Sequence, residues 1–258
     1  MPTQVVAVAN QKGGVGKTTT TVNLAACLAA LGKRILLADL DPQANATSGL
    51  GLEKAEGASA YRPLLGDGSL LDKIQRTVFD RLEVIPSEID LCGAEIELAR
   101  ADNHLLRFSQ ALGPVREAGR FDLILVDCPP SLGILTLNSF AAADWLLVPL
   151  QCEYYALEGV SMINRILTQL REGRINQRLG LLGIVMTMFD VRTKLSQQVV
   201  SEVRQHFGES VFDTVIPRST RLAEAPSFGK PIIYYDKYSA GAAAYEVLAQ
   251  EVAGRLKI

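Results

Sequence analysis

Short apolar runs alternate with stretches of helical periodicity along most of the chain. The runs are bounded by turn-forming residues and lie at 5–9, 35–38, 82–85, 123–126, 145–148, 182–186 and 211–216. Near-continuous apolar strands with helices between them are typical of a mostly parallel sheet that is covered on both faces. The pattern therefore predicts a doubly wound α/β fold, in which ligands bind at the carboxyl ends of the strands.

Two segments depart from this alternation. Residues 53–80 have the weakest periodicity, and we expect a surface excursion with short helices there. Residues 240–256 predict a terminal helix with an apolar stripe that runs from Tyr245 to Leu256. We expect this stripe to pack against the body of the protein.

Composition sets bounds on the class of protein. With 258 residues, of which 48% are hydrophobic, the chain can bury a full core, and we expect a single domain over 1–258. We expect a cytoplasmic protein, because no apolar run approaches the about 18 residues of a membrane span and no leader precedes the first strand. The cysteines form no C-x-x-C pair, which favours reduced, mostly buried thiols. A net charge of −2 means that any DNA binding needs a local basic patch.

A glycine-rich loop stands between the first apolar run and a helical stretch. Its sequence is Lys12-Gly13-Gly14-Val15-Gly16-Lys17-Thr18-Thr19. Backbone N–H groups of such a loop and of the first helical turn converge on one point, and the helix dipole adds positive potential, so the loop predicts a phosphate site. Lys17 would reach the terminal phosphates, and the Thr18 hydroxyl would ligate a Mg²⁺ that bridges them.

Acidic residues end two of the predicted strands. Asp39 and Asp41 follow the second strand, on the same side because strand side chains alternate, and Asp127 follows the fourth. A group that orients the water attacking a γ-phosphate must lie close to it, and we assign that role to Asp41, with Asp39 behind it. We expect Asp127 to hold Mg²⁺ through a water, while Pro129 and Pro130 impose an extended exit. Turn formation or capping is the alternative role for these acids.

The loop departs from the common phosphate-loop pattern G-x-x-x-x-G-K-[ST], because Gln11 stands where the first glycine would be and Lys12 stands beside it. This variant resembles the deviant Walker A ATPases, a group of P-loop NTPases that contains ParA/Soj, MinD, the nitrogenase iron protein and amide-forming synthetases. In that group a signature lysine similar to Lys12 touches the nucleotide of the other subunit. The resemblance implies ATP as substrate, an ATP-dependent sandwich homodimer, and catalytic roles for Lys12, Lys17 and Asp41.

Three blocks, at 10–20, 39–51 and 215–232, narrow the resemblance to ParA/Soj chromosome-partitioning ATPases. The resemblance implies that Pro217 packs against adenine. Because the chain begins at the first strand, we expect no N-terminal helix-turn-helix region of the kind found in longer plasmid relatives. The family often has glycine where this chain has Ala44. The resemblance therefore does not fix the backbone conformation at this position.

The resemblance also implies partners. In ParA/Soj proteins the ATP-bound dimer binds double-stranded DNA without sequence preference, and a DNA-bound ParB-type partner stimulates hydrolysis. It implies a nucleoid-associated protein with DNA contacts at Arg192 and Arg221, and with Lys194 and Arg218 as neighbours. A solvated face of mixed charge is the alternative for these residues, because acids are interspersed among them.

Two other functions stay open. A MinD-like membrane-cycling ATPase needs a basic amphipathic anchor near the C-terminus, whereas only Arg255 and Lys257 are basic in the last turns. We therefore expect no membrane anchor. A metabolic ATP-dependent synthetase needs an acceptor pocket, and no group of residues in the sequence specifies one.

Overall fold

The computed structural model describes residues 2–153, 168, 170, 172, 173 and 175–258. The strands are β1 (Gln4–Val8), β2 (Ile35–Asp39), β3 (Gln75–Arg76), β4 (Leu82–Ile85), β5 (Leu123–Asp127), β6 (Trp145–Gln151), β7 (Gly180–Phe189) and β8 (Val211–Pro217). The α-helices are α1 (Lys17–Ala30), α2 (Asn45–Gly49), α3 (Tyr61–Leu65), α4 (Leu91–Leu98), α5 (Arg107–Glu117), α6 (Ile134–Ala142), α8 (Lys194–Phe207), α9 (Thr220–Glu224), α10 (Ile232–Tyr235) and α11 (Ala240–Leu256). Short 3₁₀ turns are η1 (Leu70–Lys73), η2 (Gly208–Ser210) and η3 (Ala225–Phe228).

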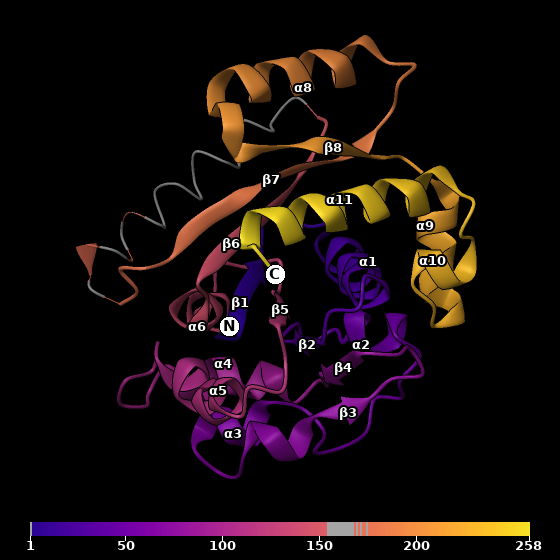
Figure 1. The fold of residues 1–258 in the computed structure, drawn as a ribbon. Helices are drawn as coiled ribbons and strands as arrows, with labels where there is room; N and C mark the ends of the chain where they lie inside the picture. Colours follow the sequence, from indigo (N-terminus) through magenta and orange to yellow (C-terminus); the bar gives the residue numbers. More distant parts are fainter. Residues whose placement is uncertain (1, 154–167, 169, 171, 174) are drawn as a thin grey trace.

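The strands form one eight-stranded sheet in the order β3-β4-β2-β5-β1-β6-β7-β8 (Figure 1). Every neighbouring pair is parallel except β3 with β4. The seven strands predicted from the sequence are confirmed. Strand β3 was not predicted; it has two residues and lies in the excursion at 53–80, where α3 and η1 are the expected short helices.

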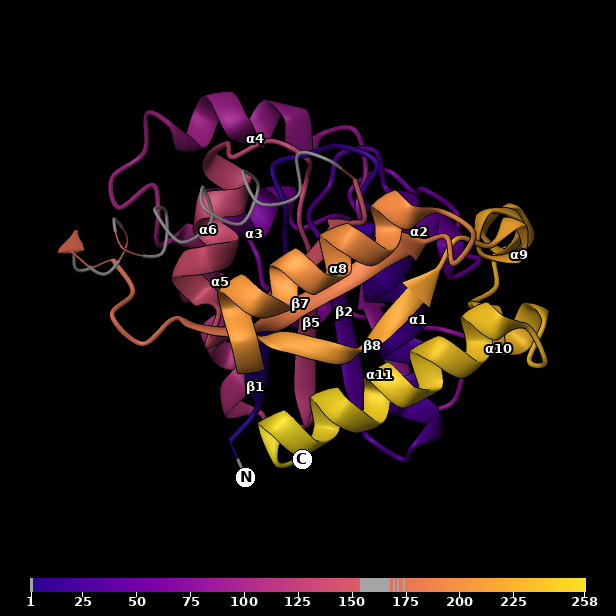
Figure 2. The ribbon, with the colours of Figure 1, turned by 90° about the horizontal axis from the view of Figure 1, so that it is seen from above.

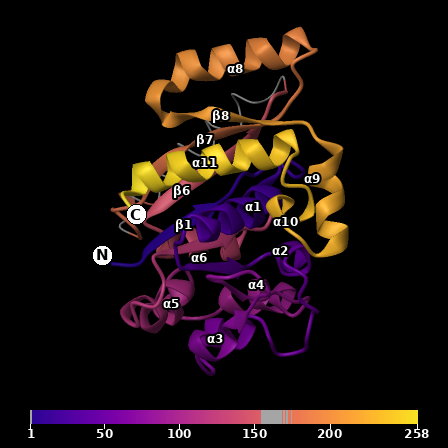
Figure 3. The ribbon, with the colours of Figure 1, turned by 45° about the vertical axis from the view of Figure 1, so that its right-hand side comes forward.

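Each central strand is buried on both faces, which explains its near-continuous apolar sequence. In β1, Val5 and Ala7 contribute to one core cluster and Val6 and Val8 to the other. Helices α3, α4, α5, α6 and α8 cover the first face, and α1, α2, α10 and α11 cover the second (Figures 2 and 3). The sheet is therefore the middle of three layers.

Helix α11 packs as predicted. Its stripe residues Tyr245, Leu248, Val252 and Leu256 are all buried in the second core cluster. The same helix also closes the edge of β8, where the backbone N–H groups of Asp213 and Thr214 donate to the Glu251 carboxylate. Covering an edge strand in this way removes a template for pairing with another chain.

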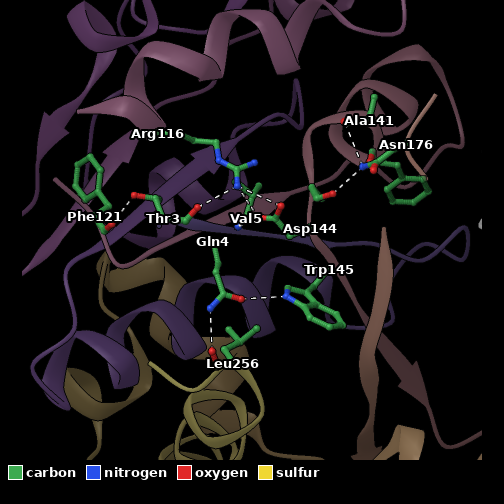
Figure 4. A network of polar contacts seen from close by, with 12 residues as sticks. Thr3, Gln4, Val5, Arg116, Phe121, Ala141, Asp144, Trp145, Asn176 and Leu256 are labelled. Atoms are coloured by element: carbon green, nitrogen blue, oxygen red, sulfur yellow. Dashed lines mark hydrogen bonds and ion pairs between the residues drawn. The ribbon is translucent and has the colours of Figure 1, made fainter. Parts of the chain in front are cut away.

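Polar contacts tie the amino end of β1 to its surroundings (Figure 4). Arg116 forms an ion pair with Asp144 at 2.9 Å, and the same carboxylate accepts a hydrogen bond from the Val5 N–H. The Gln4 side chain bridges the indole of Trp145 and the carbonyl of Leu256. Structural contacts thus hold the amino end of β1 in place. The glycine loop lies at the opposite end of this strand.

The strand order creates a crevice at the carboxyl ends of β1 and β5. After β1 the chain crosses to β2 on one side, whereas after β5 it crosses to β6 on the other. Connections that leave neighbouring strands in opposite directions open the standard ligand site of doubly wound sheets. The parallel register places Asp127 level with both Val8 and Asp39, so the glycine loop and the two acids meet there.

Candidate phosphate and nucleotide site

The glycine loop, residues 9–16, runs from β1 into α1, which begins at Lys17. Gly16 precedes the helix with a φ of 89°, a left-handed conformation that a residue with a Cβ adopts only at a cost. The first N–H groups of a helix have no partner within it, and the dipole makes its start positive. The loop and α1 therefore have the geometry that the predicted anion site requires.

Hydrogen bonds to two distant strands hold this loop in place. The Asn10 side chain accepts a hydrogen bond from the Lys12 N–H at 3.1 Å and donates one to the Pro149 carbonyl at 2.7 Å. The Thr187 hydroxyl donates to the Val15 carbonyl at 2.8 Å. These contacts connect the loop to β6 and β7, so its backbone is organised before any ligand arrives.

Lys17 lies inside the loop and is 7% exposed. Its ammonium donates to the carbonyl of Lys12 at 3.0 Å. Burial lowers the pKa of Lys17, and the charges of Asp127 and Asp41 partly oppose that shift. Those two acids and Lys17 therefore share one electrostatic environment, which is the grouping that the sequence predicts.

Asp127 is fully buried at the end of β5. Its Oδ1 accepts a hydrogen bond from the Thr21 hydroxyl at 2.8 Å, whereas its Oδ2 has no hydrogen-bond partner in the described part of the chain. Burial and the nearby charge of Asp39 raise the pKa of Asp127 to about 8, although the hydroxyls of Thr18 and Thr21 act in the opposite direction. A buried carboxylate oxygen without a partner is costly unless a cation or a water satisfies it.

The oxygen atoms at this point fit a magnesium ion that is held jointly with a substrate. The Thr18 hydroxyl and the unpartnered Oδ2 of Asp127 are hard oxygen donors of the kind that Mg²⁺ prefers. No group of three or more His, Cys, Asp or Glu side chains that could hold a metal occurs among the described residues. An ion here would therefore need ligands from phosphate and water, as Mg²⁺ in nucleotide sites usually does.

Asp39 and Asp41 differ in their surroundings. Asp39 is fully buried, and its Oδ2 accepts hydrogen bonds from the N–H and the hydroxyl of Thr47 at 2.8 and 2.7 Å. Burial raises its pKa to about 6 despite these bonds. Asp41 is 6% exposed, and its Oδ1 accepts a hydrogen bond from the Gln43 N–H at 2.9 Å. Asp39 therefore anchors α2, while the charge of Asp41 acts on Lys17.

The backbone after these acids is unusual at Ala44. This residue precedes α2 with a φ of 53°, and its N–H donates to the Asp41 carbonyl at 2.8 Å. Residues with a Cβ seldom adopt the left-handed region, and glycine does so readily. Ala44 thus adopts a left-handed conformation that would cost less free energy with glycine, the residue that the family often has here.

A small cavity adjoins the loop on the side of β7 and β8. It has a volume of about 170 Å³ and is lined by Gly16, Thr19, Pro217 and Leu222, among others. Met188 also lines it, with a φ of 53°, a strained conformation that often marks a functional site. Pro217 therefore lies beside the glycine loop, and its packing against adenine stays a prediction.

The side chains of Lys12 and Lys17 point in different directions. Its ammonium lies 2.6 Å from the Glu153 carboxylate, and the two side chains are 47% and 44% exposed. Glu153 is also held by the side-chain amide of Gln151 at 2.5 Å. The lysine that resembles the family's signature residue is thus paired at the surface within its own chain.

The two arginines that the resemblance assigns to DNA are exposed and already paired. Arg192 forms an ion pair with Asp190 at 2.7 Å, and its hydrogen bonds lower the pKa of Asp190 to about 2. Arg221 lies 3.0 Å from Glu224 and 3.5 Å from Asp236. A phosphate group must therefore compete with a carboxylate for each guanidinium.

The four basic residues gather at one end of the sheet. Arg192 and Lys194 follow β7, Arg218 follows β8, and the ends of these strands pair at Phe189 and Pro217. Arg221 lies in the next helix, α9, one turn further along the chain. Common location at one end of the sheet is compatible with one phosphate-binding face, and it is equally compatible with a solvated face of mixed charge.

Sequence reasoning did not identify several residues that hold the site together. Thr21 lies four residues after Lys17 on one helix face, so helical spacing could have indicated that its hydroxyl reaches Asp127. Asn10, Thr47 and Glu153 act through contacts to residues that lie 8 to 141 positions away in the sequence. The sequence carries no local signal for such contacts.

Comparisons with known proteins agree with this geometry. A family model described as an AAA domain matches residues 3–181. The chain is 54% identical to the chromosome-partitioning ATPase Soj of Thermus thermophilus, covering 98% of this chain and 96% of that protein. It is 51% identical to the sporulation initiation inhibitor protein Soj of Bacillus subtilis, covering 97% and 98%.

One similar solved structure is the cobyrinic acid a,c-diamide synthase of Mycobacterium smegmatis with bound ADP and magnesium. It is 38% identical with a TM-score of 0.82, and the match covers 96% of this chain and 93% of that one. This likeness supports the fold, while the full-length identities of about half select the subgroup. The chain belongs to the ParA/Soj family of chromosome-partitioning ATPases.

Proposed function

We propose that this chain binds ATP with Mg²⁺ at the glycine loop and uses it to switch between a monomer and a DNA-binding dimer. The observation that carries the proposal is the convergence of Lys17, Asp41 and Asp127 at the carboxyl ends of neighbouring strands. The proposed cycle is that ATP pairs two subunits on DNA and hydrolysis releases them. This makes the protein a partition ATPase that acts in the cytoplasm on the nucleoid.

The site's own residues account for the hydrolysis step. Phosphoryl transfer depends mainly on positioning and on neutralising charge. The N–H groups of the loop and the Lys17 ammonium bind the phosphates, and Asp41 orients the attacking water. Magnesium, held by the Thr18 hydroxyl and through a water by Asp127, would neutralise charge that develops on the phosphates. Pro217 supplies an apolar wall for the adenine base.

The surface position of Lys12 supports a two-subunit site. Its ammonium points to Glu153 and not into its own phosphate loop, where the Lys17 ammonium lies. A second subunit facing the loop could receive this ammonium on its own nucleotide, and by symmetry would return one. The dimer then contains two shared sites, and ATP binding favours pairing.

Pairing would control DNA affinity by adding phosphate contacts. With about three contacts per subunit, the slope of log K against log salt would be near −3 for a monomer and near −5 for a dimer. Arg192 and Arg221, with Lys194 and Arg218, are the residues proposed for these contacts. A DNA-bound ParB-type protein would stimulate hydrolysis and thereby return the dimer to weakly binding monomers.

Sedimentation velocity with Mg²⁺ tests the dimer directly. We expect a dimer with a non-hydrolysable ATP analogue and a monomer with ADP. The Asp41→Ala variant should stay dimeric in ATP, because slow hydrolysis preserves the bound triphosphate. Asp80→Ala is the control, because Asp80 is a surface acid whose side chain is 94% exposed. A chain that stays monomeric when saturated with the analogue contradicts the proposal.

The likeness to the diamide synthase favours a metabolic synthetase as second candidate. Such an enzyme would turn over ATP rapidly with a small acid, without DNA or a protein partner. The synthetase function holds if that turnover is found, and the partition function holds if DNA and a partner are required.

The MinD-like alternative receives no support from α11. None of the helices in the described residues is long and apolar enough to cross a membrane. A surface-lying anchor would instead use the apolar stripe of α11, and this stripe is already packed against the second core cluster. Co-sedimentation with anionic liposomes and ATP tests this alternative, and the proposal expects the protein in the supernatant.

A further inference from the structure

Two glycines bring the segment after α2 into backbone contact with the end of η3. Gly51 has a φ of +78° and Gly229 a φ of +61°. A Cβ on Gly229 would lie 2.6 Å from the Cα of Gly51, and one on Gly51 would lie 3.0 Å from the carbonyl oxygen of Gly229. Neither position has room for a side chain, so the two backbones touch. We call this the Gly51–Gly229 contact.

One side of this contact is connected to the loop at 39–41, which carries Asp39 and Asp41. The Asp39 carboxylate binds the N–H and the hydroxyl of Thr47 inside α2, and the Ala44 N–H binds the Asp41 carbonyl. Helix α2 has only five residues, and Gly51 donates to the Ser48 carbonyl at 2.9 Å just beyond it. A shift of the loop at 39–41 therefore carries Gly51 with it.

The other side of the contact is connected to helix α9, which carries Arg221. Helix α9, which carries Arg221, continues directly into η3, and Gly229 ends η3 with its N–H on the Pro226 carbonyl. Figure 3 shows α2 beside α9 and α10. Gly229 is thus eight residues from Arg221 along a short, continuously turning segment.

Space around α2 is unequal. A cavity of about 420 Å³ lies between α1, α2 and η3 and is lined by Thr18, Ser48 and Pro226, among others. This space separates α2 from the first turn of α1, where Thr18 would meet the metal and phosphates, and it leaves room for α2 to shift there. At Gly51 it cannot move toward η3 without displacing Gly229, because two backbones in contact have no rotamers that absorb the movement.

We propose that the Gly51–Gly229 contact couples the loop at 39–41 to the segment at 220–229, which carries Arg221. Gly51 and Gly229 act as positioning residues: binding of Mg²⁺ and triphosphate moves α2, and η3 with α9 follows. The proposal rests on the proposed function for its DNA readout. Its structural readout, the response of 220–229 to nucleotide, does not require DNA.

Two variants and two matched controls test the coupling. Gly51→Ala and Gly229→Ala place a methyl group in the contact. Gly57→Ala and Gly119→Ala are the controls, because their φ values of +74° and +59° impose similar strain and nothing lies within 4 Å of their Cβ positions. For each full-length protein, we would measure ATP-analogue affinity, dimerisation, and DNA dissociation constants with ADP and with the analogue. Hydrogen exchange of 220–229 would be followed on addition of Mg²⁺ and analogue.

The expected result is selective loss of coupling. In Gly51→Ala and Gly229→Ala the ratio of the ADP to the analogue DNA dissociation constant falls at least about fivefold, the lower range of allosteric couplings, and the exchange response of 220–229 is lost. Nucleotide affinity and dimerisation stay within about twofold of the wild type, and the controls keep the full ratio. If Gly229→Ala does not fold, Gly51→Ala decides. Its added Cβ would lie 3.0 Å from the nearest atom, whereas the Cβ added at Gly229 would lie 2.6 Å away.

Two results would overturn the coupling: an unchanged ratio in folded, dimerising contact variants, or wild-type exchange at 220–229 that does not respond to nucleotide. A wild type that responds at 220–229 and yet binds no DNA would refute the DNA function and leave the coupling supported. The two failures are therefore distinguishable.

Discussion

The ammonium of Lys12 lies 2.6 Å from the carboxylate of Glu153 in the same chain. Lys12 cannot keep this ion pair and also extend to a nucleotide on a second subunit. The pair therefore competes with the proposed dimer. Because both side chains are nearly half exposed, we expect the competition to be weak.

Removing the charge of Glu153 should favour the dimer. An exposed ion pair stabilises by about 0.2–1 kcal/mol, and formation of the symmetric dimer breaks two such pairs, so Glu153→Gln should tighten ATP-dependent dimerisation by at most about 30-fold. Sedimentation equilibrium with the ATP analogue measures the change. Asp67→Asn is a matched control, because it breaks the exposed pair of Arg62 and Asp67 elsewhere on the surface. Weaker dimerisation of Glu153→Gln would show that the pair is part of the dimer and not its competitor.

Asp127→Asn should separate stability from activity. Asparagine keeps an oxygen that accepts from Thr21, and it replaces Oδ2, which has no partner among the described residues, by an uncharged amide group. We expect an unchanged or raised melting temperature, together with a 10–100-fold loss of Mg²⁺ affinity in the nucleotide complex, which is the usual effect of losing a group that acts through a water. Mg²⁺ titration of ATPase activity, with thermal melting beside it, measures both. Normal Mg²⁺ dependence would remove Asp127 from the metal site.

The raised pKa of Asp127 predicts that the stability of the nucleotide-free protein depends on pH. The pKa of Asp127 is raised to about 8 in the folded protein from an ordinary value of 3.8. The folded state thus holds a proton that the unfolded state has released, so this stabilisation is complete below about pH 4 and is lost as the pH rises toward 8. We expect the wild type to lose stability relative to Asp127→Asn over this window. Urea unfolding at several pH values tests this, and a constant difference between the two proteins would contradict it.

The DNA assignment predicts a loss that depends on the nucleotide. Arg192→Glu and Arg221→Glu should each abolish most ATP-dependent DNA binding while nucleotide binding stays intact. Each should also reduce the salt slope by about 2 in a dimer, since each subunit loses one phosphate contact. Arg62→Glu, on α3, is the control. Unchanged DNA binding in both variants would favour the solvated face of mixed charge.

Ala44→Gly should stabilise the fold. Glycine adopts the φ of 53° found at this position without the Cβ clash, and relief of that clash is worth about 1 kcal/mol. Ala46→Gly is the comparison, because Ala46 lies inside α2, where glycine costs about 1 kcal/mol. Opposite signs in urea unfolding are expected. A destabilised Ala44→Gly would mean that the methyl group makes contacts that outweigh the strain.

The sequence by itself determined the fold class, seven strands, α11 and the glycine loop. Local rules suffice for these features: a buried parallel strand must be apolar, a helix that packs has an apolar stripe, and a loop that approaches phosphate needs glycine. The same rules indicated Asp41 and Asp127, because an acid at the carboxyl end of such a strand faces the ligand crevice.

Only the tertiary structure decided which side chains complete the site. The contacts of Thr47 with Asp39, of Thr187 with the loop carbonyl and of Glu153 with Lys12 join segments that are far apart in sequence or turned toward each other by a short loop. The contact between Gly51 and Gly229 has the same origin. Local preferences depend on neighbours along the chain, whereas these contacts depend on how the sheet orders its strands and how closely its helices pack.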